Sequence, residues 1–186
     1  MFFRHGMAIL LAAWSSSALA ISADVSIGED SARFEFGSYV SGLAQGRTQS
    51  EIGLLYNTDE DNVFHAGMHV YDIAGTKTPG LQLGIGGRVY AGDVINDNVI
   101  ALGLGAEVLY RPDTANRLGF GASVHYAPDV VSFVDCKRYL ESALKVEYSL
   151  LPKANVYLGY RRVSGKTDSG KFTADDGAHV GVNIQF

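Results

Sequence analysis

Three groups of residues in this sequence have types and spacings that could do chemistry. Ser123 and His125 lie two positions apart, as a nucleophile and a general base could. His65 and His69 lie four apart, a spacing that on a helix would suggest a metal site. The third group has four acids and four bases: Glu51, Glu107, Glu141, Glu147, Arg88, Arg111, Lys145 and Arg161. Which of these side chains can meet depends on the elements that carry them.

Most of the chain alternates between apolar residues and small or polar ones with a period of two, which predicts β-strands. The clearest run is Gly80–Gly92, where leucine, isoleucine and valine share one face and glycine, glutamine and arginine the other. The predicted strands are Gln49–Asn57, Asn62–Asp72, Gly80–Gly92, Val99–Arg111, Leu118–Tyr126, Leu140–Leu150, Ala154–Ser164 and Ala178–Phe186. Their lengths suit tilted strands that cross a membrane, for which about 9–11 residues are needed.

Three features favour a membrane barrel with its apolar face outward. The other face is mainly glycine, alanine and serine with isolated charges, which fits the interior of a narrow barrel. Tyrosines near strand ends on the apolar face are typical of an aromatic girdle: Tyr56, Tyr110, Tyr126 and Tyr148. The last alternating residues resemble the insertion signal of bacterial outer-membrane barrels: Val180, Val182, Ile184 and Phe186. Together they predict an all-β, antiparallel, up-and-down transmembrane barrel.

The number of strands is open between eight and ten. A single-chain bacterial barrel needs an even number, and Arg33–Ser41 alternates as a ninth candidate. Either this segment lies outside the barrel, or a short tenth strand lies in Val130–Val134. We expect eight strands in a barrel domain of residues 49–186, preceded by an N-terminal segment of residues 21–48, and ten strands is the alternative.

Residues 1–20 predict a cleaved signal peptide. Arg4 lies in a short positive region, Met7–Trp14 is apolar, and Ser15–Ala20 ends in small residues. We expect cleavage after Ala20 and export to the bacterial outer membrane. The apolar run is too short for a membrane-spanning helix, which takes about 20 residues.

Composition excludes several other classes of protein. Of the 186 residues 47% are hydrophobic, which excludes a disordered chain. The formal net charge is −5 and no basic block is present, so nucleic acid is not an expected partner. The single cysteine, Cys136, excludes a disulfide-stapled miniprotein. This cysteine is either a bystander or a link to another chain.

All eight charged residues of the third group fall on the face that the barrel turns inward. Eight strands enclose a space just wide enough for side chains, and unpaired buried charges are costly. We therefore expect the four acids and four bases to pair as a polar plug. A polar path through the barrel is the alternative.

The inward histidines do not predict a metal or catalytic site. His65 and His69 stand about 13 Å apart along a strand, too far for one metal, and no acid or cysteine at ligand spacing completes a site. Ser123 and His125 are about 6.6 Å apart at Cα, and catalysis on lipid would need them at the lipid-facing rim. We expect no enzyme, no cofactor and no metal.

Longer connections are expected outside the cell and shorter ones in the periplasm. The expected external ones are Thr58–Asp61, Asp93–Asp97, Pro128–Lys137 and Gly165–Gly177, and the periplasmic ones are Ile73–Pro79, Asp113–Asn116 and Leu151–Lys153. The external ones are acidic: Asp59, Glu60, Asp61, Asp93, Asp97, Asp129, Asp135, Asp168, Asp175 and Asp176 outnumber Lys137, Lys166 and Lys171. They could bind divalent cations that bridge lipopolysaccharide, or a cationic partner. Scattered carboxylates are also common at solvated loop tips.

Several segments resemble the YfaZ family of bacterial outer-membrane proteins. They are Ala18–Ser22 at the signal ending, His125–Asp129 before Tyr139–Glu141, Leu158–Arg161, and His179–Asn183 before the terminal Phe186. The resemblance covers most of the mature chain and is strongest from Gly119 onward. It implies an outer-membrane barrel without an established activity and brings no catalytic residues.

The sequence thus predicts a small outer-membrane barrel with a plugged polar interior and a structural or interaction role through its external loops. A narrow channel and a lipid-modifying enzyme are the alternatives, and a soluble periplasmic barrel would need its aliphatic face turned inward. The expected partners are outer-membrane lipid and lipopolysaccharide, together with the barrel-assembly machinery through the C-terminal strand.

Overall fold

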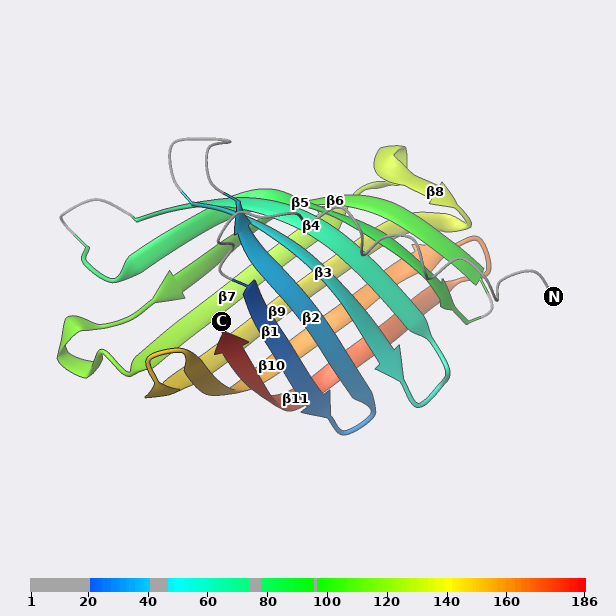
Figure 1. Cartoon of the computed structure of the whole chain (residues 1–186). Helices are drawn as coiled ribbons and strands as arrows, with labels where there is room; N and C mark the ends of the chain where they lie inside the picture. The colour runs from blue at the N-terminus through cyan, green and yellow to red at the C-terminus, as the bar shows by residue number, and fades with distance from the viewer. Residues whose placement is uncertain (1–20, 41–46, 74–77, 96) are drawn as a thin grey trace.

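Ten antiparallel strands close into a barrel (Figure 1). The computed structural model describes residues 21–40, 47–73, 78–95 and 97–186. The barrel strands are β1 Ile21–Gly28, β2 Ser31–Val40, β3 Arg47–Asn57, β4 Asn62–Ile73, β5 Leu81–Val94, β6 Asp97–Tyr110, β7 Leu118–Ala127, β9 Cys136–Leu151, β10 Ala154–Thr167 and β11 Lys171–Gln185. Each strand pairs with the next along the chain, β7 pairs with β9, and β11 pairs with β1 to complete the ring.

The expectation of eight strands is corrected to the alternative of ten, although the tenth strand is not the one foreseen. The candidate Arg33–Ser41 corresponds to β2, which lies inside the barrel between β1 and β3. The strand that completes the even number is β1, which directly follows the predicted signal peptide. Residues 21–40 therefore belong to the barrel, and residue 49 does not mark its beginning.

A short strand, β8 Ser132–Val134, lies outside the ring in the segment where the tenth strand was sought. It pairs with Val99–Ala101 of β6, beyond the point where β7 ends at Ala127. A free strand edge presents unpaired N–H and C=O groups. The β8 strand therefore covers the part of β6 that β7 is too short to reach.

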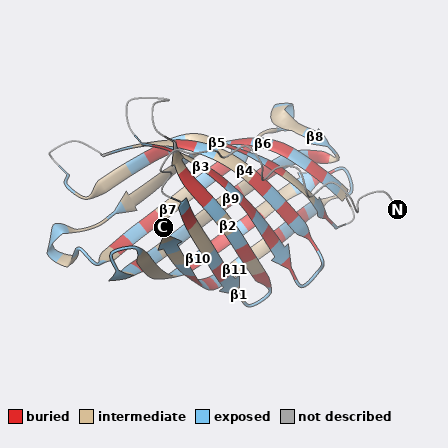
Figure 2. Cartoon of the chain, in the orientation of Figure 1, coloured by how far each residue is buried: buried red, intermediate tan, exposed pale blue. Residues whose placement is uncertain are grey.

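The barrel is apolar outside and polar inside, as the alternation predicted. Figure 2 shows buried and exposed residues alternating along the strands. Large aliphatic side chains are exposed on the outer face, among them Ile85 at 69%, Leu104 at 71% and Leu144 at 61%. Charged and polar side chains such as Glu51, Arg88 and Glu141 are buried inside. A soluble barrel with an inward aliphatic face is therefore excluded.

The girdle tyrosines lie on the outer face near both ends of the barrel. Tyr56 and Tyr126 lie near one end, and Tyr110 and Tyr148 near the other, each about two-fifths exposed. The amphipathic tyrosine ring favours the interface between headgroups and hydrocarbon. Their positions fit two belts.

The two ends of the barrel differ, and we name them by what they hold. The terminal end holds both Ile21 and Phe186, and the N–H of Phe186 donates to the carbonyl oxygen of Ile21 at 2.8 Å. The hairpin end holds the connections β1–β2, β3–β4, β5–β6, β7–β9 and β10–β11. In the described part of the chain the helical elements are two single 3-10 turns, η1 Asp113–Ala115 at the terminal end and η2 Asp129–Val131 at the hairpin end. No helix among the described residues is long and apolar enough to cross a membrane.

The expected long external loop Gly165–Gly177 is corrected to a strand hairpin. β10 continues to Thr167 and β11 begins at Lys171, with a register shift between Val163 and Ser164. The shift turns Phe172 and Ala174 into the barrel, where both are 3% exposed. The bulge conceals the alternation because it changes which residues of β11 face inward.

Candidate functional site: a lumen closed at one end

The side chains that fill the lumen form three layers along the barrel axis. Two strands show the order: from the terminal end, β5 carries Gln82, then Arg88, then Tyr90, and β9 carries Glu147, then Glu141, then Tyr139. Polar groups lie around a cavity at the terminal end, ion pairs fill the middle, and apolar groups pack at the hairpin end.

The apolar layer closes the hairpin end. Its buried members are Leu55, Val63, Tyr90, Val94, Val99, Ala101, Ala127, Cys136, Tyr139, Val163, Phe172 and Ala174. The rings of Tyr90 and Tyr139 lie 4.2 Å apart at their centroids, and Tyr139 lies 6.1 Å from Phe172. Tyr90 on β5 and Phe172 on β11 come from opposite walls of the ring of strands. The three aromatic side chains therefore bridge the lumen.

The ionic layer crosses the lumen directly beneath these rings. Glu141 Oε1 accepts hydrogen bonds from Arg33 at 2.6 Å and from Arg88 at 3.0 Å. Arg88 also donates to Glu51 and, at 3.2 Å, to Glu107. These side chains come from five strands, and their mutual pairing compensates charges that the interior would otherwise disfavour.

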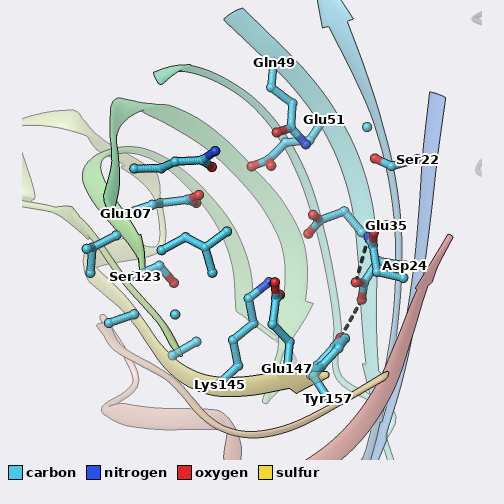
Figure 3. Close-up of a pocket in the computed structure, with 18 of the residues that line it drawn as sticks. Ser22, Asp24, Glu35, Gln49, Glu51, Glu107, Ser123, Lys145, Glu147 and Tyr157 are labelled. Atoms are coloured by element: carbon cyan, nitrogen blue, oxygen red, sulfur yellow. Dashed lines mark hydrogen bonds and ion pairs between the residues drawn. The ribbon is translucent and has the colours of Figure 1, made fainter. Parts of the chain in front are cut away.

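A polar vestibule occupies the remaining, terminal half of the lumen. Its volume is about 680 Å³, and both polar and apolar side chains line it. Figure 3 shows Gln49, Glu107, Lys145, Glu147 and Tyr157 around it, on strands from different sides of the barrel. The vestibule ends at the ionic layer, since Arg33, Arg88 and Glu141 are among its lining residues.

All eight charged residues expected inside do face the lumen, in three separate groups. Glu51, Arg88, Glu107 and Glu141 belong to the ionic network. Glu147 pairs with Arg111 and, at 3.5 Å, with Lys145 at the side of the vestibule. Arg161 pairs with Asp175 rather than with any of the other seven. Contrary to our expectation from the sequence, the four acids and four bases therefore do not pair only with one another.

The sequence analysis missed five functional side chains of the lumen: Asp24, Arg33, Glu35, Tyr157 and Asp175. Arg33 and Glu35 bond each other at 2.8 Å, and Tyr157 donates to Asp24 at 2.5 Å. Four of the five lie on the inward parity of β1, β2 or β10, so a complete set of strands would have identified them. Asp175 was assigned to an external loop, but β11 extends back to Lys171, and Asp175 shares the inward parity of His179 on that strand.

The serine–histidine pair does not form a catalytic unit. Nε2 of His125 lies 2.7 Å from Nε2 of His69 on β4, so it meets another histidine rather than Ser123. His125 is fully buried, and Ser123 lines the vestibule. Neither side chain lies at the lipid-facing rim that the enzyme alternative requires.

Two acidic residues at the hairpin end, Asp97 and Asp168, are held in local contacts. Lys137 pairs with Asp168, which raises the pKa of the lysine through that hydrogen bond. Asp97 accepts a hydrogen bond from Ser169 at 3.0 Å. Hydrogen bonds from Thr167 and Ser169 lower the pKa of Asp97.

Comparison with known proteins gives a family match and a match to a solved structure. The family model described as YfaZ precursor matches residues 3–186. No curated protein matches the sequence. A solved structure titled KdgM porin is 11% identical, with a TM-score of 0.45, over 90% of this chain and 99% of that one. The family model covers nearly the whole sequence, and the chain therefore belongs to the YfaZ family.

Proposed function

We propose that this protein is a non-conducting barrel of the bacterial outer membrane that opens a polar vestibule to the periplasm. The exposed aliphatic outer face with tyrosines near both ends supports the membrane location. The signal pattern of residues 1–20, which lie outside the described residues, supports export, and so does the word precursor in the family's description.

The terminal end faces the periplasm in this proposal. An exported chain reaches the outer membrane from the periplasm, and ten strands return the second terminus to the side of the first. The vestibule opens at that same end. The hairpin end, with Thr58–Asp61 and Pro128–Asp135, then faces outward.

The observation that carries the proposal is the bridge of Tyr90, Tyr139 and Phe172 across the lumen. A side-chain bridge above a paired ionic layer leaves ions no continuous polar path, because the apolar layer would strip their hydration without replacing it. The protein would then act as a structural or interacting component of the envelope.

Outer-membrane lipid and lipopolysaccharide are the partners that this proposal implies. The turn η2 and strand β8 expose Val130 at 84%, Phe133 at 53% and Val134 at 61%. Apolar side chains on this segment fit contact with the outer leaflet better than contact with water. Recognition of Val180, Val182, Ile184 and Phe186 by the barrel-assembly machinery stays a prediction.

A narrow channel is the second candidate, because the vestibule already opens half of the lumen. Displacement of the aromatic bridge would leave only the ionic layer between the two sides. Single-channel conductance of the refolded protein separates the two candidates.

Sided chemical labelling tests the location and the orientation. In a Cys136→Ser background, Gln49→Cys lies in the vestibule, Asp59→Cys in an external turn and Ala101→Cys in the apolar layer. A membrane-impermeant maleimide should label Asp59→Cys on intact cells and Gln49→Cys only after the outer membrane is permeabilised. Ala101→Cys should remain unlabelled in both.

The reverse pattern for Asp59→Cys and Gln49→Cys would overturn the orientation. Labelling of Ala101→Cys on folded protein would overturn the closure. Recovery of the protein in osmotic-shock fluid rather than in the membrane fraction would overturn the membrane location itself.

A further inference from the structure

Two buried histidines on separate strands meet inside the lumen, beside a carboxylate that lines the vestibule. Nε2 of His69 on β4 lies 2.7 Å from Nε2 of His125 on β7. Glu107 Oε1 on β6 lies 3.9 Å from the first of these nitrogens and 3.8 Å from the second. The three potential ligand atoms lie within 4.8 Å of one another.

The strand register explains how the two imidazoles reach each other. His69 pairs with Gly86, Gly86 with Gly105, and Gly105 with His125, in one row across four neighbouring strands. A Cβ at Gly86 would lie 2.4 Å from His69 Cδ2, and one at Gly105 would lie 2.2 Å from His125 Cδ2. The two glycines therefore leave the space that the rings occupy.

We propose that His69, His125 and Glu107 form a binding site for one divalent transition-metal ion of the zinc class. Two imidazole nitrogens and one carboxylate oxygen are a donor set that Zn²⁺ commonly takes, with a water as fourth ligand. In a tetrahedral site with bonds of about 2.0–2.1 Å the ligand atoms stand about 3.3 Å apart. The nitrogens would separate by about 0.6 Å and the carboxylate would approach by a similar distance.

The surroundings favour this use of the histidines. Nδ1 of His69 and Nδ1 of His125 are buried without a hydrogen-bond partner. Metal at both Nε2 atoms places a proton on each Nδ1, and that of His69 then faces Glu51 Oε1 at 3.5 Å. A carboxylate behind a metal-binding histidine is the usual orienting arrangement.

The carboxylate is oriented as well, and it provides the entry. The Tyr71 hydroxyl donates to Glu107 Oε2, which leaves Oε1 turned toward the histidine pair. Arg88 also bonds Oε1, at 3.2 Å, and is itself compensated by Glu51 and Glu141. The Glu107 side chain is 19% exposed to the vestibule, so an ion entering there meets this ligand first.

The site goes beyond the proposed function and does not depend on it, because a barrel that conducts would present the same three ligands. The test uses the mature barrel refolded in detergent, stripped of metal with a chelator, and checked for folding by its heat-modifiable mobility in gel electrophoresis. Zn²⁺ is titrated in competition with a chromophoric chelator, and bound Co²⁺ is followed by its visible absorption. The variants are His69→Gln, His125→Gln and Glu107→Gln, with His179→Gln as the matched control.

His179 is a suitable control because it is also buried and faces the lumen, but packs against Tyr157 away from the cluster. We expect one Zn²⁺ per barrel with a dissociation constant of about 1 μM or lower, and an intense Co²⁺ spectrum of the tetrahedral type. Either histidine variant should weaken binding by about 100-fold, Glu107→Gln by about tenfold or more, and His179→Gln should leave it unchanged.

Absence of stoichiometric Zn²⁺ binding by the folded wild-type barrel would overturn the proposal. Zn²⁺ affinity as high in folded His69→Gln and His125→Gln as in the wild type would do the same. If neither histidine variant folds, Glu107→Gln and the Co²⁺ spectrum of the wild type decide. A weak, octahedral Co²⁺ spectrum would then assign any bound metal to surface carboxylates and overturn the site.

Discussion

The two halves of the lumen use the same strands and the same residue types in different ways, and the tyrosines show the difference best. At the hairpin end, Tyr90 and Tyr139 pack on each other, and the Tyr90 hydroxyl is buried without a hydrogen-bond partner. At the terminal end, the hydroxyls of Tyr71 and Tyr157 donate to Glu107 and Asp24. Position along the strand, rather than residue type, decides whether the ring fills space or anchors a charge.

The charges make the same distinction. Arg33 and Arg88 are shielded from water and share Glu141, with side chains 10% and 6% exposed. Arg111 and Lys145 share Glu147, but their side chains are 34% and 42% exposed to the vestibule. Water can replace a lost partner in the second group and not in the first.

The largest difference should follow from removing the central acid of each group. Glu141→Ala removes the carboxylate that two buried guanidiniums share, where water cannot replace it, and should lower the free energy of unfolding by about 3–5 kcal/mol. Glu147→Ala leaves cations that water can solvate and should cost about 1 kcal/mol. Urea unfolding of the refolded barrels, followed by tyrosine fluorescence, measures both. Equal losses of unfolding free energy would mean that water is excluded equally from the two groups, which would contradict the contrast.

A smaller effect, of opposite sign in the two halves, is expected from removing single hydroxyls. Tyr157→Phe removes the hydrogen bond to Asp24 and should cost about 1.5–3 kcal/mol. Tyr90→Phe removes a buried hydroxyl without a partner and should be neutral or stabilise by about 1 kcal/mol. The same unfolding experiment applies, and a loss of stability in Tyr90→Phe comparable to that in Tyr157→Phe would contradict the contrast.

The smallest effect should come from Asp97, at the solvated rim of the hairpin end. Hydrogen bonds from Thr167 and Ser169 lower its pKa below 3.8, so its contribution is present above the unfolded pKa and lost as the pH falls through the folded value. Asp97→Asn should therefore lower stability slightly near neutral pH, where the contribution is present, and leave it unchanged at pH values below the folded pKa, so that the acid limb of the stability profile becomes flatter. The midpoint of urea unfolding as a function of pH measures this, and a loss confined to strongly acidic pH would contradict it.

Alternation within strands was enough to predict much of the fold. It located nine of the ten barrel strands, and it predicted correctly that all eight charged site residues face inward. β1 was missed although its residues alternate, because it directly follows the predicted signal peptide. The inward side chains of Phe172 and Ala174 were missed for a different reason, since the bulge opposite Ser164 changes the parity of β11.

Contacts between strands could not be predicted in the same way. Pairing of Arg33 with Glu141, or the row from His69 through Gly86 and Gly105 to His125, depends on register between strands. A shift of one residue reverses the face of every side chain, and no pattern within one strand specifies it relative to its neighbour. The sequence analysis therefore examined histidine distances along single strands and had no means to find the pair that meets.

The most direct test of a lumen closed at one end is single-channel conductance of the refolded mature protein in a planar bilayer. Folded and inserted wild-type protein should give no steady conductance steps, because the aromatic bridge and the ionic layer lie in series. The triple variant with Tyr90→Ala, Tyr139→Ala and Arg88→Ala should give steps, since it removes part of both barriers. Steady conductance from the wild type, changed by Arg88→Ala alone, would show an open polar lumen and contradict the account.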